Sequence, residues 1–158
     1  MDVLKQLLTY AFLLALVWAG ITYLPRLSRV QLSVDYSEIN VPGVEEYKSY
    51  SLDRAATIPM LRHGDAVCYR IAKGDDAMAN GFGYVAGVPG DLVQITKGKV
   101  VVNGEVNRFS GDTLLAEVGP LIIPENHVYV VTTHHNTDSV ARGPLPAAAL
   151  RGRVGDFP

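Results

Sequence analysis

A loop in the first half of the chain has the outline of a segment that carries a nucleophile. Residues 54–67 read RAATIPMLRHGDAV: a polar turn, a proline, aliphatic residues, and a Gly-Asp pair that opens an expected strand. Covalent hydrolysis needs a hydroxyl or thiol beside a group that removes its proton. The hydroxyl of this loop belongs to Thr57, so acyl transfer by Thr57 is the first chemistry to consider.

The thiol of Cys68 is the second candidate nucleophile. Cys68 is the single cysteine of the chain and lies between Val67 and Tyr69 in an expected strand. Without a second cysteine there is no intramolecular disulfide, CxxC redox pair or thiolate zinc cluster. A nucleophilic thiol also needs an activating histidine nearby, so we interpret Cys68 as a small buried apolar side chain.

Histidines are the candidate metal ligands or triad members. His134 and His135 are adjacent, and neighbouring side chains in a regular strand point to opposite faces. No further histidine or carboxylate stands beside them at recognised metal spacing. We expect TTHHNTDS to form a polar loop, His63 to lie in a surface turn, and the protein to use neither a metal nor another cofactor.

Composition limits the classes of partner. The chain of 158 residues has 14 basic and 16 acidic residues, a formal net charge of -2, and no long basic run. Binding along a phosphate backbone needs such a run, so nucleic acid is not an expected partner. The length suits one domain with a modest core.

The N-terminal region predicts a membrane span. Between Lys5 and Arg26 lie 20 residues without a charge, and a helix of about 20 apolar residues crosses a bilayer. A cleavable signal has a shorter apolar core with small residues after it, whereas Val17-Trp18-Ala19 lies inside the run. We predict an uncleaved anchor over residues 1–29, spanning residues 6–25, followed by one domain over residues 30–158.

The charges that flank this span leave its orientation open. Trp18 and Tyr23, followed by Arg26 and Arg29, are typical of a membrane interface. Lys5 and the α-amino group nearly balance the two arginines, with a slight preference for a cytoplasmic C-terminal domain.

Strands dominate the remaining sequence. Short alternating or apolar runs recur after residue 30: VQLSV, DAVCYRI, GYVAGV, LVQI, KVVV and HVYVVTT. Lys97-Gly98 and Asn103-Gly104 supply tight turns. Helical periodicity of useful length appears only at residues 145–150. The pattern predicts a mainly β fold, either a compact barrel or a sandwich.

Three segments, in this order, resemble the type I signal peptidase family, including its conjugative-transfer and pilin-processing branch. They are PMLRHGDAV, YVAGVPGDLVQITKGKVVVNGEV and HVYVVTTHHNTDSVARGPLPAAALRGRV. With the N-terminal span, the resemblance covers nearly the whole chain and implies a signal-peptidase-like β-barrel or sandwich domain with one transmembrane helix. The matched motif positions are Pro59, Gly64, Asp65, Gly87, Pro89, Gly90, Asp91, Asp138, Ser139 and Gly143.

The catalytic pair that the resemblance implies is missing. The family uses a serine nucleophile and a lysine general base. Its serine stands three residues before the motif proline, which is Ala56 here, and its lysine stands four residues before the turn glycine, which is Gly83 here. A methyl group cannot attack a carbonyl, and glycine has no side chain to accept a proton.

The third segment departs from the family pattern as well. Asp138 and Ser139 match, but Val140 stands where an arginine would follow them. In the family these two residues help to hold the lysine and its surroundings. Without a lysine we expect Asp138 and Ser139 to form a turn.

The other hydroxyl and amine side chains are poor candidates to replace the missing serine and lysine. In an extended segment Thr57 would point away from the side to which Ala56 points. Lys73 lies in the loop-like stretch IAKGDDAMANG, where an exposed amine with a pKa of about 10 stays protonated. Ser49 and Ser51 lie upstream, with no anchor that places either beside a base.

These observations predict a catalytically degenerate signal peptidase homologue. It would bind exported or pilin-like polypeptides by strand addition, as an accessory or assembly factor of a pilus or conjugative secretion apparatus. Two alternatives stay open: an active serine or threonine peptidase with relocated residues, and a purely structural subunit of an envelope complex. Cleavage of a substrate would distinguish the active peptidase from the other two possibilities. A peptide bound in a substrate groove would distinguish the degenerate homologue from the purely structural subunit.

The expected location and further partners follow from the resemblance. It implies a single-pass protein of the bacterial inner membrane, with the N-terminus inside and the β domain on the periplasmic or outer face. An active peptidase paralogue and secretion-complex subunits are candidate partners beside the exported polypeptide and the membrane.

Overall fold

The computed structural model describes residues 2–23, 29–31, 49–73, 77–110, 115–132 and 138–155. Two α-helices, two 3₁₀ helices and eleven strands follow one another in these ranges. In chain order they are α1 (Asp2–Tyr23), β1 (Arg29–Gln31), β2 (Ser49–Asp53), η3 (Ile58–Met60), β3 (Ala66–Lys73), β4 (Ala77–Gly87), β5 (Leu92–Thr96), β6 (Lys99–Val102), β7 (Glu105–Val106), β8 (Val118–Ile122), β9 (His127–Val131), α2 (Ser139–Arg142), β10 (Leu145–Pro146), η4 (Ala147–Ala149) and β11 (Leu150–Gly155).

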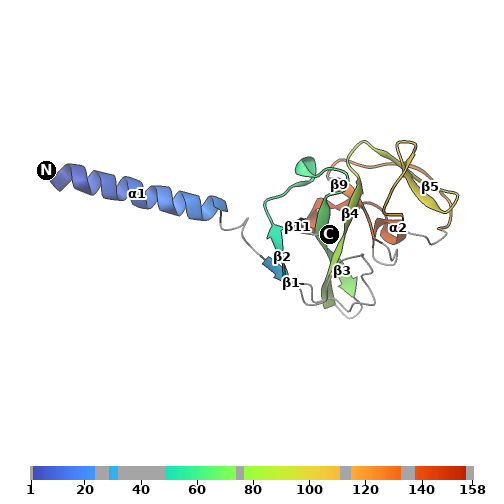
Figure 1. Ribbon diagram of the computed structural model, residues 1–158, viewed down its shortest axis with the longest axis horizontal. Coiled ribbons are helices and arrows are strands. Elements are labelled where there is room, and N and C mark those ends of the chain that lie inside the picture. Colours follow the sequence, from blue (N-terminus) through green and yellow to red (C-terminus); the bar gives the residue numbers. More distant parts are fainter. Residues whose placement is uncertain are drawn as a thin grey trace.

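The N-terminal helix α1 stands apart from the strands (Figure 1). Its stretch Lys5–Tyr23 has 19 residues, is apolar enough to cross a membrane, and is not buried against the rest of the protein. Leu14, Trp18 and Ile21 each expose about 70% of their surface. A helix with exposed apolar side chains on all its faces is poorly solvated by water and well solvated by lipid. The predicted apolar helix is therefore confirmed, and by length and composition it fits a membrane anchor or a signal sequence.

The strands form two antiparallel sheets. The larger has the order β1-β2-β11-β3-β4-β9-β10, and the smaller has the order β7-β6-β5-β8. In the larger sheet the C-terminal strand β11 lies between β2 and β3, so segments from both ends of the domain are neighbours. The prediction of a mainly β fold is confirmed.

Most of the expected strands and both expected turns are present. AVCYRI of the expected DAVCYRI lies in β3, and GYVAG of the expected GYVAGV lies in β4. LVQI lies in β5, and KVVV and HVYVV form β6 and β9. Lys97 and Asn103 have φ of 49° and 51°, and each is followed by a glycine with positive φ. These left-handed pairs are what a two-residue hairpin turn requires.

Two local expectations are wrong. Residues 145–150 are not one helix: Pro146 is extended at ψ 155°, Leu145 pairs with Val128 of β9, and only the 3₁₀ turn η4 follows. Strand pairing overrides the helix-forming alanines here. The stretch around Lys73 is not a loop, since Lys73 is the last residue of β3 and pairs with Ala77; residues 74–76 lie outside the described part.

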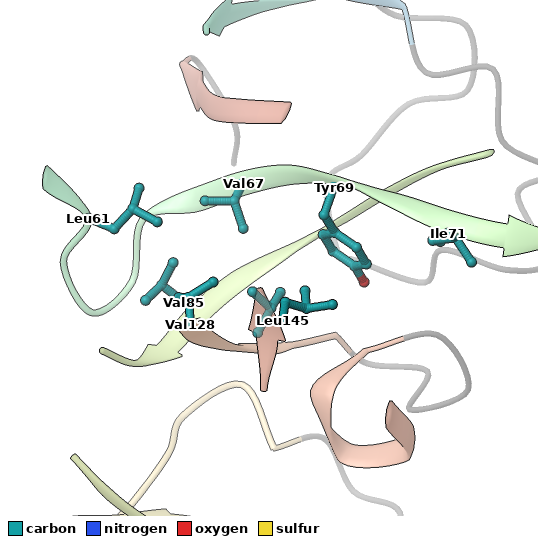
Figure 2. Packing of buried hydrophobic residues seen from close by; sticks show 8 residues of the cluster. Leu61, Val67, Tyr69, Ile71, Val85, Val128 and Leu145 are labelled. Atoms are coloured by element: carbon teal, nitrogen blue, oxygen red, sulfur yellow. The ribbon is translucent and has the colours of Figure 1, made fainter. Parts of the chain in front are cut away.

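Alternate side chains of β3 enter two different core clusters. Figure 2 shows Val67, Tyr69 and Ile71 on one face of β3, directed toward the cluster that includes Val85, Val128 and Leu145. On the opposite face Cys68 packs with Tyr50, Leu52 and Phe82. A third cluster joins the two sheets, with Ala86, Tyr129 and Val131 from the larger sheet and Val93, Ile95, Val100 and Val102 from the smaller.

Cys68 is an inert core residue, as predicted. Its side chain has no exposed surface. Burial raises the pKa of its thiol to about 12, although the positive charges of Arg151 and Arg54 act to lower it. The thiol is therefore protonated at neutral pH and is a poor nucleophile.

Candidate functional site

The turn after β2 positions Ala56, the residue at the predicted nucleophile position. The Ala55 N–H donates to Asp53 Oδ1 at 3.1 Å, and the Ala56 N–H donates to the Asp53 carbonyl at 3.3 Å. Thr57 then precedes η3, where the Met60 N–H donates to the Thr57 carbonyl at 2.9 Å. The backbone of Ala56 is thus held between a tight turn and a helical turn.

Ala56 and Thr57 both border a cavity of about 350 Å³. Ala56 is only 6% exposed, whereas Thr57 is exposed, as expected for neighbours in an extended segment. The remaining walls come from η3, the β8–β9 connection, η4 and β11: Ile58, Pro59, Asn126, Ala147, Leu150, Arg151, together with Arg54.

A second cavity of about 390 Å³ adjoins the first. Its lining includes Pro59 and Leu61 of the first motif segment and Val88 and Pro89 of the GVPGD turn. The two cavities share Ile58, Pro59 and Asn126. Together they form a groove, called here the Ala56 groove, along the first two motif segments.

The described lining of this groove contains no lysine or histidine. Its cations are Arg54 and Arg151, and a guanidinium stays protonated, so neither can act as a base. The carboxylate of Glu125 borders the second cavity and not the one that Thr57 lines. In the part of the chain that the structure describes, Thr57 therefore has no base beside it.

The space beside Gly83, the residue at the predicted base position, is closed by neighbouring atoms. Gly83 pairs with Val67 in the β3–β4 ladder. A Cβ at position 83 would lie 2.7 Å from Val130 Cγ1, 2.9 Å from Thr132 Cγ2 and 3.0 Å from the Val131 carbonyl oxygen. These atoms belong to β9 and the residue after it, and none of their residues lines the Ala56 groove. Ala56 therefore borders open space, whereas Gly83 does not.

Asp138 and Ser139 hold this part of β9 in place. The fully buried Asp138 caps α2 by accepting from the Val140 N–H at 2.9 Å, and its other oxygen accepts from the Thr132 N–H at 2.8 Å. Ser139 Oγ accepts from the Val130 N–H at 2.8 Å. The expectation of a simple turn is therefore corrected: these residues begin a helix and tie it to β9.

Asp91 joins three segments that are distant in the sequence. Its Oδ2 lies 2.6 Å from His63 Nε2 and accepts from the Val88 N–H at 2.7 Å, while Oδ1 accepts from Asn103 Nδ2 at 2.7 Å. Burial raises the pKa of this carboxyl, but the hydrogen bonds from Val88, His63 and Asn103 outweigh burial and leave the pKa below 3.8. Asp91 is thus a charged tie between the GVPGD turn, the first motif loop and the Asn103-Gly104 hairpin.

The sequence did not reveal the role of His63. Its side chain is 52% exposed, which agrees with the expected surface turn, but its contact with Asp91 spans 28 residues. No local spacing rule connects residues that far apart.

The Gly64-Asp65 pair of the first motif is also structural. The Gly64 N–H donates to the Val85 carbonyl, and the Val85 N–H donates to the Asp65 carbonyl, both at 2.8 Å. Gly64 has φ of 86°, which favours glycine, and Asp65 Oδ2 accepts from the Arg62 N–H at 2.9 Å. This turn fastens the first motif loop to β4.

Several candidate site residues lie outside the part of the chain that the structure describes. His134 and His135 lie among residues 133–137, which the structure does not describe, and the side chains of Lys73 and Ser49 are likewise outside it. The expectations that concern them stay predictions.

No protein-family model matches the chain. Among solved structures, the chain is similar to a signal peptidase I from Enterococcus faecalis V583, with a TM-score of 0.44 and 15% sequence identity. The alignment covers 59% of this chain and 95% of that chain.

We predict that Gly83→Ala destabilises the β domain. The added methyl group would force Val130 and Thr132 aside, at a cost of about 1–3 kcal/mol. Gly119→Ala is the matched control, because a Cβ there has no atom within 4 Å. Urea unfolding followed by circular dichroism measures both variants, and equal stabilities would contradict the packing of β9 on Gly83.

Asp91 makes the fold sensitive to acid. Its pKa is lowered in the folded state, so its contribution is present above the ordinary value of 3.8 and is lost as the pH falls further. Between about pH 5 and about pH 2.5, Asp91→Asn should therefore lose less stability than the unaltered chain. Urea midpoints at several pH values test this, and parallel curves for the two proteins would refute it.

Proposed function

We propose that the chain is a membrane-anchored, catalytically degenerate relative of the type I signal peptidases that binds an extended polypeptide without cutting it. The Ala56 groove carries the proposal. It runs along the two motif segments that would flank a scissile bond, yet a buried methyl group stands at the nucleophile position. No amine or imidazole lines the described groove.

The size and walls of the groove suit a peptide. Its adjoining cavities of about 350 and 390 Å³ each fall within the range of ligand pockets, about 300–1,000 Å³. Ile58, Pro59, Leu61, Val88 and Pro89 give it apolar walls. An extended chain places alternate side chains on one side, so adjoining apolar pockets can accept successive side chains of that set.

Catalysis by relocated residues is the less supported alternative. It needs a hydroxyl and a base at about 3 Å from each other. Thr57 supplies a hydroxyl at the cavity, but the groups beside it in the described structure are apolar, amide or guanidinium. At Gly83 the packing of β9 leaves no space for a longer side chain.

A structural role in an envelope complex is the second candidate, and one surface favours it. Strand β8 lies at the edge of the smaller sheet and is exposed throughout. Val118, Leu121 and Ile122 expose 48%, 38% and 65% of their surface there. Exposed apolar edges of this kind are suited to contact with another protein.

The proposed client is an exported or pilin-like polypeptide, and the proposed setting is a pilus or conjugative secretion apparatus. The resemblance of the three motif segments to the pilin-processing branch supports this part, and α1 supports a position at the membrane. An active peptidase paralogue would then do the cutting.

A cleavage profile tests the absence of catalysis. Residues 30–158 are incubated with signal-peptide and pilin-precursor substrates beside an active family member, and products are identified by mass spectrometry. We expect intact substrates, because no nucleophile is paired with a base. Products that disappear in Thr57→Val or Lys73→Met would instead establish a relocated peptidase site.

Protease accessibility tests the proposed side of the membrane. External protease added to intact spheroplasts should digest the β domain, because the proposal places it on the outer face. Digestion only after the spheroplasts are lysed would place the domain in the cytoplasm and exclude a role with exported chains.

A further inference from the structure

Two arginines border the Ala56 end of the groove. Arg54 precedes the turn that holds Ala56, and Arg151 belongs to β11. The other described residues around this cavity are apolar or carry a hydroxyl or amide, and none is a carboxylate. The cavity therefore combines positive charge with an apolar wall, and binding of apolar side chains alone does not account for the charge.

Arg54 and Arg151 both act electrostatically on the buried thiol of Cys68. Cys68 lies in β3, next to β11, and the charges of Arg151 and Arg54 both act to lower the pKa of its thiol against the larger effect of burial. Both guanidinium groups are therefore close enough to β3 to act on the same buried residue.

Neither arginine is neutralised by a carboxylate among the described residues, unlike the neighbouring Arg153. Arg153 lies 3.7 Å from Asp53 and 3.9 Å from Asp65, and Asp53 also accepts from the Ala55 N–H. Arg151 instead donates from Nη1 to Asn80 Oδ1 at 2.7 Å. That contact orients the guanidinium through a neutral partner and leaves its charge uncompensated.

We propose that this cavity binds a peptide carboxylate, which Arg54 and Arg151 hold while the wall of Ala56, Ile58 and Leu150 receives the adjacent apolar side chain. Planar guanidinium groups bind carboxylates through paired, charge-assisted hydrogen bonds. The inference rests on the proposed peptide-binding function and adds the chemistry of the ligand. The carboxylate belongs either to the free C-terminus of a peptide or to an aspartate or glutamate side chain.

Binding of defined peptides to the full chain in phosphatidylcholine nanodiscs tests the proposal. The fluorescent probes are an apolar peptide ending in alanine with a free C-terminus, the same peptide amidated, and amidated versions with one internal aspartate or asparagine. We expect at least one carboxylate peptide to bind roughly tenfold more tightly than its neutral counterpart. Comparison of the free C-terminus with the internal aspartate identifies the source of the carboxylate.

Arginine variants assign that difference to the cavity. Arg54→Gln and Arg151→Gln should each remove most of the preference, whereas Arg142→Gln, on the exposed surface of α2, should leave it unchanged. Added salt should reduce the preference as well, because the guanidinium of Arg54 is exposed to solvent. Arg54→Gln gives the decisive result if Arg151→Gln does not fold.

The outcomes separate this inference from the proposed function. Equal binding of charged and neutral peptides would overturn the carboxylate site but leave peptide binding intact. A preference that survives both arginine variants would also overturn it. Failure of every peptide to bind would overturn the proposed function and this inference with it.

Discussion

The close approach of β9 to Gly83 is the contact that fixes how β9 lies against β4 in the larger sheet. With no Cβ at position 83, Val130 and Thr132 lie against the β4 backbone. The buried Asp138 and Ser139 fix that arrangement by accepting from the N–H groups of Thr132 and Val130. A side chain at position 83 would have to displace β9 and would leave these buried groups without partners, which is costly. Position 83 is therefore part of the core, and a lysine could not be introduced there without moving β9.

The walls of the Ala56 groove are held by contacts that lie outside the predicted nucleophile and base positions. The groove lining includes residues of the first motif loop and of the GVPGD turn, and Asp91 ties these two segments together through His63 and the Val88 N–H. The Gly64-Asp65 turn fastens the same loop to β4 by backbone hydrogen bonds. None of these contacts needs a nucleophile or a base. The walls of the groove are thus held in place without a catalytic pair, as the proposed binding function requires.

Much of the fold was predictable from the sequence because it depends on interactions between residues that are close in the chain. The apolar alternation of β3 and the left-handed conformations at Lys97 and Asn103 depend on neighbouring residues only. Counting from Pro59 and Gly87 places Ala56 and Gly83 at the nucleophile and base positions, and that assignment stays a prediction. The alanine-rich stretch after Leu145 was mispredicted because strand pairing with β9 decides its conformation.

Long-range contacts account for what the sequence did not reveal. The roles of Asp138 and Ser139 depend on hydrogen bonds to β9, and the pairing of His63 with Asp91 depends on how two loops meet. The closed space at Gly83 depends on β9 being the neighbour of β4 in the sheet. The pair Arg54 and Arg151 has the same origin, because β11 returns to lie beside β2. Each follows from sheet order, which no single stretch of sequence specifies.

Site-specific photocrosslinking tests the central claim most directly, namely that the Ala56 groove holds a polypeptide intact. A benzophenone side chain replaces Thr57, which is exposed at the groove, in the full chain in nanodiscs with a defined pilin precursor. The same group at Val118 of β8, outside the described groove lining, is the control. The account predicts an adduct at position 57 with the mass of the uncut precursor, and much less adduct at position 118. Equal adducts at both positions, or an adduct at position 57 that contains only a cleaved fragment, would contradict it.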